Sequence, residues 1–179
     1  METIVRIAGN AGAVRLAVRA LRSFPEDPPV IKIAFYVLGN LVFLQRFCEE
    51  ALSSNALVLV VAALGRCAKQ SDVQGAACYC LARLCDSDDA AVTADALSMG
   101  AMKLALAALR SHRTNEYASA NASSLSKVLC FDETCAVKAK QLGALVLLQA
   151  ALKAHSLNKD VQREVAAALA YIQRFVDAA

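Results

Sequence analysis

One feature of this sequence limits its fold more than any other: the chain resembles itself at a nearly constant step. A glycine or asparagine followed by Ala and an aliphatic residue begins at residues 12, 55, 100 and 143, so successive copies are 43, 45 and 43 residues apart. A leucine at residues 21, 64, 109 and 152 recurs with the same spacing. Self-similarity at this period is typical of stacked repeat proteins, in which every copy is one small structural unit.

The residue at the start of each copy predicts a sharp corner between two helices. Gly12, Gly100 and Gly143 occupy this place in three copies, and Asn55 replaces glycine in the other. Asparagine is the non-glycine residue that best tolerates the left-handed backbone conformation, so the exchange keeps the corner. A polar loop with helix-starting residues follows later in each copy, at 27–28, 71–72, 114–115 and 158–160.

A long helix is expected after each loop, and its apolar residues form rows across the copies at steps of 43, 44 and 44 residues. The rows are Val30, Val73, Tyr117 and Val161; Leu38, Leu81, Leu125 and Leu169; and Leu41, Leu84, Val128 and Ile172. A third, short helix fits before each corner, at 44–53, 90–98 and 134–142. We therefore predict an all-α fold, a right-handed α-α superhelix of four three-helix repeats in a single domain, 1–179, with repeats at about 1–43, 44–87, 88–131 and 132–179.

Composition supports helices over strands. Hydrophobic residues make up 58% of the chain but aromatic residues only 6%, and seven Gly and three Pro are too few for a fold built on turns. No apolar run approaches the ~20 residues that cross a bilayer, and the N-terminus lacks the pattern of a signal peptide. We expect no membrane insertion and a cytoplasmic or nuclear location. The last helix, 161–179, carries enough polar residues (Arg163, Glu164, Gln173, Arg174 and Asp177) for a modest cap, so we expect a complete small domain.

The copies resemble the armadillo repeat family, which includes β-catenin and the importin-α transport receptors. The Gly-Ala-aliphatic corner and the ending of the first long helix, Ala-Phe-Tyr-Val-Leu-Gly-Asn-Leu at 34–41, carry the resemblance. In importin-type members, an Asn on the third helix holds the backbone of an extended peptide, and an aromatic residue four positions earlier contacts its side chains. The resemblance assigns these roles to Asn40 and Tyr36.

The other copies depart from that pattern. The second has Tyr79 and Arg83, the third Ser123 and Lys127, and the fourth Ala167 and Tyr171. A groove that presents Arg83 and Lys127 is poorly suited to a basic nuclear signal. We instead predict an adaptor without enzymatic activity that binds an extended or helical protein segment of acidic character along the concave face. The expected contact residues are Tyr36, Asn40, Tyr79, Arg83, Ser123, Lys127, Arg163 and Tyr171.

Three alternatives remain open at this stage. The contact residues could be ordinary solvated helix positions. The chain could instead be a structural or regulatory subunit that docks through the uncharged helix at 56–64. A basic stripe of Arg15, Arg19 and Arg22 is a further surface, and we interpret it as the polar covering of an end repeat.

An enzyme is a further alternative function, but residues for catalysis or for cofactors are sparse. His112 and His155 both lie three residues after an aligned leucine, which favours a structural role at a helix end. Cys78 and Cys80 would lie about 200° apart around one helix and could not share a metal ion. We predict seven reduced cysteines, no metal and no cofactor. The net charge of +3 gives no reason to expect a nucleic acid, and no small-molecule substrate is expected.

Overall fold

The computed structural model describes residues 2–86 and 89–177, with side chains to Phe175, and over these residues the chain forms helices and no strands. The prediction of an all-α fold is confirmed. The predicted cap residue Asp177 has no described side chain. The twelve helices of the described part are α1 (Glu2–Asn10), α2 (Ala13–Ser23), α3 (Pro28–Leu41), α4 (Gln45–Ser53), α5 (Ala56–Arg66), α6 (Ser71–Cys85), α7 (Ala90–Ser98), α8 (Ala101–Ser111), α9 (Glu116–Val128), α10 (Glu133–Gln141), α11 (Ala144–Ala154) and α12 (Lys159–Asp177).

The helices follow one another in a fixed order of lengths. A helix of 9 residues, one of 11 residues and a longer one succeed each other, and the order is kept from α1 to α12. We refer to α1–α3, α4–α6, α7–α9 and α10–α12 as the four helix groups. The first helices of the groups begin at residues 2, 45, 90 and 133, so the step of 43, 45 and 43 residues holds for them as well.

The corners between the first two helices of each group have the predicted conformation. Gly12, Gly100 and Gly143 have φ values of 85°, 84° and 84°, and Asn55 has a φ of 60°. All four lie in the left-handed region, where glycine and asparagine are least strained. The prediction that Asn55 replaces glycine for a backbone reason is therefore confirmed.

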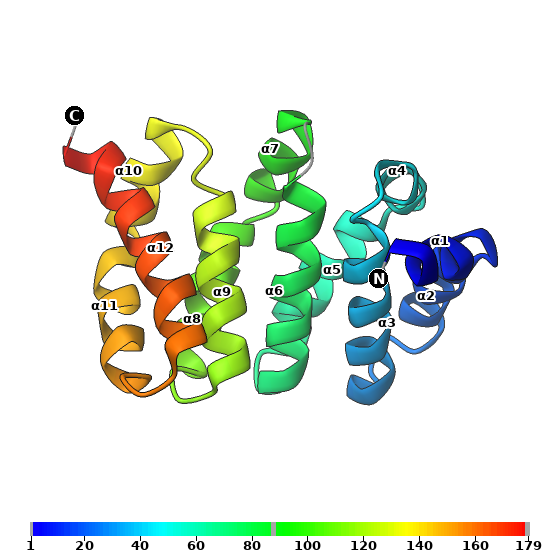
Figure 1. Cartoon of the computed structure of the whole chain (residues 1–179), viewed down its shortest axis with the longest axis horizontal. Coiled ribbons are helices and arrows are strands. Elements are labelled where there is room, and N and C mark those ends of the chain that lie inside the picture. The colour runs from blue at the N-terminus through cyan, green and yellow to red at the C-terminus, as the bar shows by residue number, and fades with distance from the viewer. Residues whose placement is uncertain (1, 87–88, 178–179) are drawn as a thin grey trace.

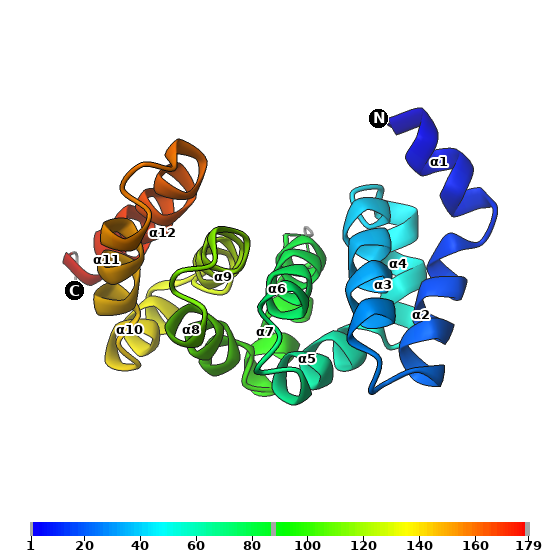
Figure 2. The same cartoon turned by 90° about the horizontal axis from the view of Figure 1, so that it is seen from below.

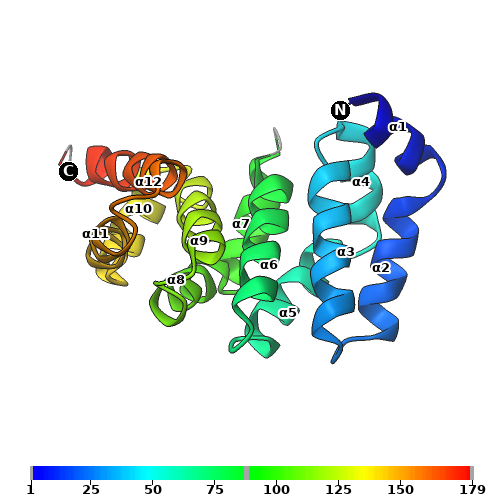
Figure 3. The same ribbon diagram turned by 60° about the horizontal axis from the view of Figure 1, so that its bottom comes forward.

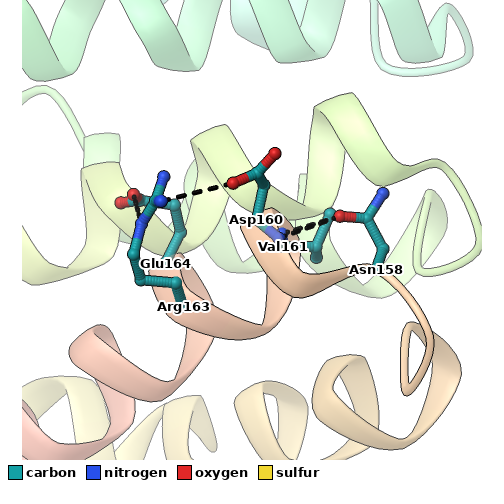
Figure 4. Close-up of polar contacts among 5 residues, drawn as sticks. All are labelled: Asn158, Asp160, Val161, Arg163 and Glu164. Carbon is teal, nitrogen blue, oxygen red and sulfur yellow. Dashed lines mark hydrogen bonds and ion pairs between the residues drawn. The ribbon is translucent and has the colours of Figure 1, made fainter.

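The long helices begin with side-chain caps in most groups. Asp27 Oδ1 accepts a hydrogen bond from the Val30 amide, and Asn115 Oδ1 accepts one from the Ala118 amide. Asn158 does the same for Asp160 and Val161 (Figure 4). The expected caps at 71–72 are wrong, because α6 begins at Ser71 and the residue before it makes no side-chain cap.

Hydrogen bonds correct the predicted register of the third long helix. Gln74 and Gln162 each donate through Nε2 to two backbone carbonyls at the end of the preceding 11-residue helix. Ser119 donates through Oγ to the His112 carbonyl, which corresponds to the second of these carbonyls in its own group, and to the adjacent Arg113 carbonyl. These three residues correspond, so the long helices recur at 43, 45 and 43 residues, and the predicted steps of 44 place residues of α9 one position too early.

The core rows confirm the corrected step. Leu41, Leu84, Leu129 and Ile172 are each at most 3% exposed. In the row expected from the sequence, Leu38, Leu81 and Leu125 are fully buried, while Leu169 is half-buried. One connected hydrophobic core runs through all four groups.

The four groups lie along an arc. Helices α3, α6, α9 and α12 lie side by side, each in contact with the next (Figure 1). Seen from below, they form the inner side of the arc, and α5, α8 and α11 lie outside them (Figure 2). Helices α2 and α3 stand at one end, with α1 beside them, and α11 and α12 stand at the other (Figure 3). In the described residues no single helix is apolar and long enough to span a membrane, although three bent helix pairs reach the required length and composition.

Candidate functional site: the inner face of the arc

The inner face holds a cluster of tyrosines around Asn40. The Asn40 amide group donates to the Tyr36 carbonyl at 2.8 Å, and its Oδ1 accepts a hydrogen bond from the Tyr79 hydroxyl at 3.1 Å. Tyr36 and Tyr79 are half-buried and Asn40 is exposed. The structure therefore brings these three predicted residues together. The bonds already made by Asn40 mean that a bound segment would share or displace them.

Tyr117 is the fourth member of this cluster, and the sequence analysis assigned it to the core. Its ring centroid lies 5.7 Å from that of Tyr36, with the planes inclined by 35°. Tyr36 is on α3 and Tyr117 on α9, so the two rings meet across the intervening helix α6. The Tyr117 hydroxyl is buried and has no hydrogen-bond partner among the described residues, and burial, assisted by the neighbouring Tyr36, raises the pKa of this phenol.

Two glycines in the long helices make room for these rings. A Cβ at Gly39 would overlap the Tyr79 ring, and a Cβ at Gly75 would overlap the Tyr117 ring. Both glycines lie inside helices, where glycine is otherwise unfavourable by about 1 kcal/mol relative to alanine. A glycine inside a long helix is a sequence signal that a side chain of a neighbouring helix packs there, but it does not identify Tyr117 as that side chain.

Arg83 lies one helical turn beyond Tyr79 on α6. Its guanidinium carbon is 5.3 Å from the ring centroid of Phe43, a residue that is 62% exposed and follows the end of α3. The Arg83 Nε atom is buried and makes no hydrogen bond to any part of the chain that the structure describes. A cation over an aromatic ring is attracted to the negative face of the ring, so Phe43 holds the arginine at the inner surface.

Lys127 and Tyr171 line a shared cavity at the other half of the inner face. The cavity has a volume of about 440 Å³, and Asp86 and Phe131 are also among its lining residues. Tyr171 packs against Phe175 at a centroid distance of 5.3 Å, in an edge-on arrangement. The structure therefore joins these two predicted residues, from α9 and α12, in one site.

One predicted contact residue is not available on the inner face. Ser123 is fully buried, and its hydroxyl donates to the Ser119 carbonyl one turn earlier at 2.7 Å. Its selection was wrong because the assumed register was one residue early. The residue that corresponds to Tyr36 and Tyr79 is Ser124, which is half-buried. By the same correction, Val128 takes the place assigned to Lys127, although Lys127 still reaches the cavity.

Arg163 is exposed but is held along its own helix. Its guanidinium pairs with Asp160 at 3.2 Å and with Glu164 at 3.3 Å (Figure 4). These neighbours neutralise its charge locally. By contrast, Arg83 and Lys127 make no ion pair with any described residue.

Comparisons with known proteins give no family. No protein-family profile and no curated protein matches this chain.

The histidines have structural positions. His112 Nε2 lies 2.8 Å from the Ala68 carbonyl, and His155 Nε2 lies 3.1 Å from the Ser119 hydroxyl. Each histidine follows the last residue of an 11-residue helix and reaches back to the preceding group. Both positions are consistent with the predicted structural role.

The cysteines are free thiols, and six of the seven are buried. Burial raises the pKa of Cys78 to about 12, and that of Cys85 to about 12, so these groups stay protonated near neutral pH. A thiol in that state is a poor nucleophile and a poor metal ligand. Among the described residues, no group of three or more His, Cys, Asp or Glu side chains could hold a metal ion.

The two competing surfaces are weaker than the sequence suggested. In α5, the stretch 56–64 exposes mainly Val58 and Ala62, and most of its other side chains are buried within the chain. In α2, Arg15 lies 3.7 Å from Glu50, and Arg22 donates to the Ser54 carbonyl at 2.7 Å. These two arginines therefore contact the second helix group, while all three arginines of the stripe remain exposed, as a polar covering surface would be.

Proposed function

We propose that this protein is an adaptor without enzymatic activity, built as a right-handed armadillo-type solenoid of four repeats, that binds an extended acidic segment of another protein along its inner face. The step of 43, 45 and 43 residues, the three helices in each group and the left-handed corner residues support the armadillo reading. The free, mostly buried cysteines fit a reducing location, the cytoplasm or the nucleus.

One observation carries the choice of function. Aromatic and cationic side chains follow each other along the inner face from α3 to α12, and the two cations among them, Arg83 and Lys127, lack an acidic partner in the described residues. Tyrosine and arginine are the residues that most often anchor protein interfaces. A segment with aspartate or glutamate would supply the missing counter-charges, and the half-buried rings would contact its apolar side chains.

A peptide-display selection with the purified protein tests the proposal. We expect enrichment of acidic peptides that also carry apolar residues. An Arg83→Glu, Lys127→Glu double variant should bind the selected peptides about two orders of magnitude more weakly, since each lost charge-assisted hydrogen bond is worth ~1.5 kcal/mol.

The matched control is Lys103→Glu, Arg110→Glu. Both residues are exposed on α8, outside the inner row of helices, and the change in net charge is the same. This control should leave the affinity nearly unchanged. Enrichment of basic or uncharged peptides, or equal losses in the two double variants, would refute the proposal.

A further inference from the structure

The end of the arc formed by α2 and α3 presents an apolar face to solvent. It contains a hollow of about 320 Å³ lined by aliphatic residues, including Leu16 and Ile33. Leu16 is 53% exposed and Ile33 is 60% exposed. A terminal unit of a stacked protein normally carries polar residues on its outer face, because no neighbour covers that face. The exposed α2–α3 face is instead lined by aliphatic residues, as the protein core is.

Two residues of this face have buried counterparts in every other helix group. Ala13 is half-buried, while its counterparts Ala56, Ala101 and Ala144 are all 0% exposed. Val37 is likewise half-buried, while Cys80, Leu125 and Ala168 are all 0% exposed. At the first internal junction, Cys80 lies close to Gly39 of the preceding group. The α2–α3 face is therefore a junction surface without its neighbour.

Helix α1 shows the same pattern. Ile4 is 73% exposed, although its counterparts Phe47 and Val92 are only 4% and 7% exposed. Phe47 is covered because its ring packs over Gly9 of the preceding group. Ile4 has the position of a residue that a preceding group would cover.

The opposite end of the arc carries the complementary half of such a junction. Ala166 on α12 is exposed, while its counterparts Phe35, Cys78 and Ser123 are all 0% exposed. Ala170, also exposed, corresponds to Gly39, the residue on which Tyr79 and Cys80 of the next group rest. This end therefore offers small residues where an internal junction receives the following group.

We propose that the α2–α3 face of one copy docks on the α11–α12 face of a second copy, so that the stack of helix groups continues from chain to chain. The register of the internal junctions determines which residues meet. Asn115 donates to the Ser71 hydroxyl at one such junction, and the residues at the corresponding places on the two free ends are Asp27 and Lys159. Both are exposed and their charges are opposite, so they favour this pairing. A pairing of two α2–α3 faces would leave Ala166 uncovered.

A head-to-tail contact uses different surfaces on the two copies and does not close on itself. The purified protein should therefore show a mass that rises steadily with concentration in analytical ultracentrifugation, in a series that reaches ~1 mM. Ile33→Glu blocks the first face and Ala166→Arg blocks the second. Each variant alone should be monomeric, with association weakened on the order of 100-fold because a charge would be buried without a partner.

A mixture of the two variants distinguishes the arrangement. The intact α11–α12 face of Ile33→Glu can still bind the intact α2–α3 face of Ala166→Arg, so an equal mixture should form heterodimers and nothing larger. Val58→Glu and Ala107→Arg, at exposed positions of the middle groups, are the matched controls and should associate like the wild type. A wild type that stays monomeric over the whole series overturns the proposal. An Ala166→Arg variant that still dimerises overturns it too, since that result indicates pairing of two α2–α3 faces.

Discussion

Replacement of Gln74 by leucine tests the hydrogen bonds that define the register. Gln74 is 2% exposed, and its Nε2 donates to the carbonyls of Leu64 at 2.8 Å and Cys67 at 3.1 Å. The Cys67 carbonyl also accepts from the Gln70 amide, so it keeps a partner in the variant. The Leu64 carbonyl at the end of α5 would lose its side-chain donor in a buried place, which costs ~1–3 kcal/mol.

We expect Gln74→Leu to lower the free energy of unfolding by about 2 kcal/mol, because the added apolar surface offsets only part of the lost hydrogen bonding. For a chain of this length that corresponds to a decrease in Tm of roughly 4–8 °C. Urea unfolding followed by circular dichroism measures the free energy.

The matched control is Gln162→Leu, which removes the same pair of hydrogen bonds in the last helix group. Gln162 is only half-buried, so water can replace its amide, and we expect a loss below ~1 kcal/mol. A Gln74→Leu protein as stable as the wild type, or a larger effect at Gln162, would refute the reasoning.

Two further predictions concern packing and pH. Gly75→Val places methyl groups where the Tyr117 ring lies and should destabilise the fold by ~2 kcal/mol. Tyr117→Ala in the same chain should recover part of that loss. Strictly additive losses of the two changes in urea unfolding would contradict the proposed contact. Burial raises the pKa of Cys78, Cys85 and Cys130 from 9.0 to about 12, so the unfolded chain releases these protons first. The contribution of these thiols to the free energy of unfolding should be fully present below pH 9 and should be lost as the pH rises from 9 toward 12. A variant with alanine at these three cysteines should show a smaller fall in the urea midpoint over this range.

The sequence alone correctly predicted the parts of the fold that depend on local conformational preferences of the backbone. Glycine at three corners and Asn55 at the fourth predicted left-handed residues, because few other residue types adopt that conformation at low cost. The all-helical class and the three helices of each group followed from the spacing of apolar residues and corners. These features are local, so a single sequence contains them.

The register of α9 could not be predicted because serine is ambiguous. Ser119, Ser123 and Ser126 are all buried, and Ser123 and Ser126 donate to the carbonyl four residues earlier. A hydroxyl satisfied by its own helix can lie in the core, but the same residue in a sequence is equally typical of a solvated face. Because these buried serines do not count as apolar residues, two alignments of α9 with the other long helices fit the sequence. The wrong alignment placed Ser123 at the surface.

The tyrosine cluster was only partly predictable, because it depends on contacts between helices far apart in the sequence. Tyr36 and Tyr79 were found from their places on successive long helices. Tyr117 was missed, since its position depends on the space left by Gly75 on another helix. Sequence spacing describes one helix at a time and does not report which ring fills a gap on its neighbour.

The contact between Tyr36 and Tyr117 has a mechanical consequence. Small rotations at the contacts between neighbouring helix groups would add up along the arc. Here the two rings touch across α6, so they resist any further bending inward at this point. A ligand that separates them would straighten the first three helix groups, and the distance between the two ends of the molecule would report its arrival.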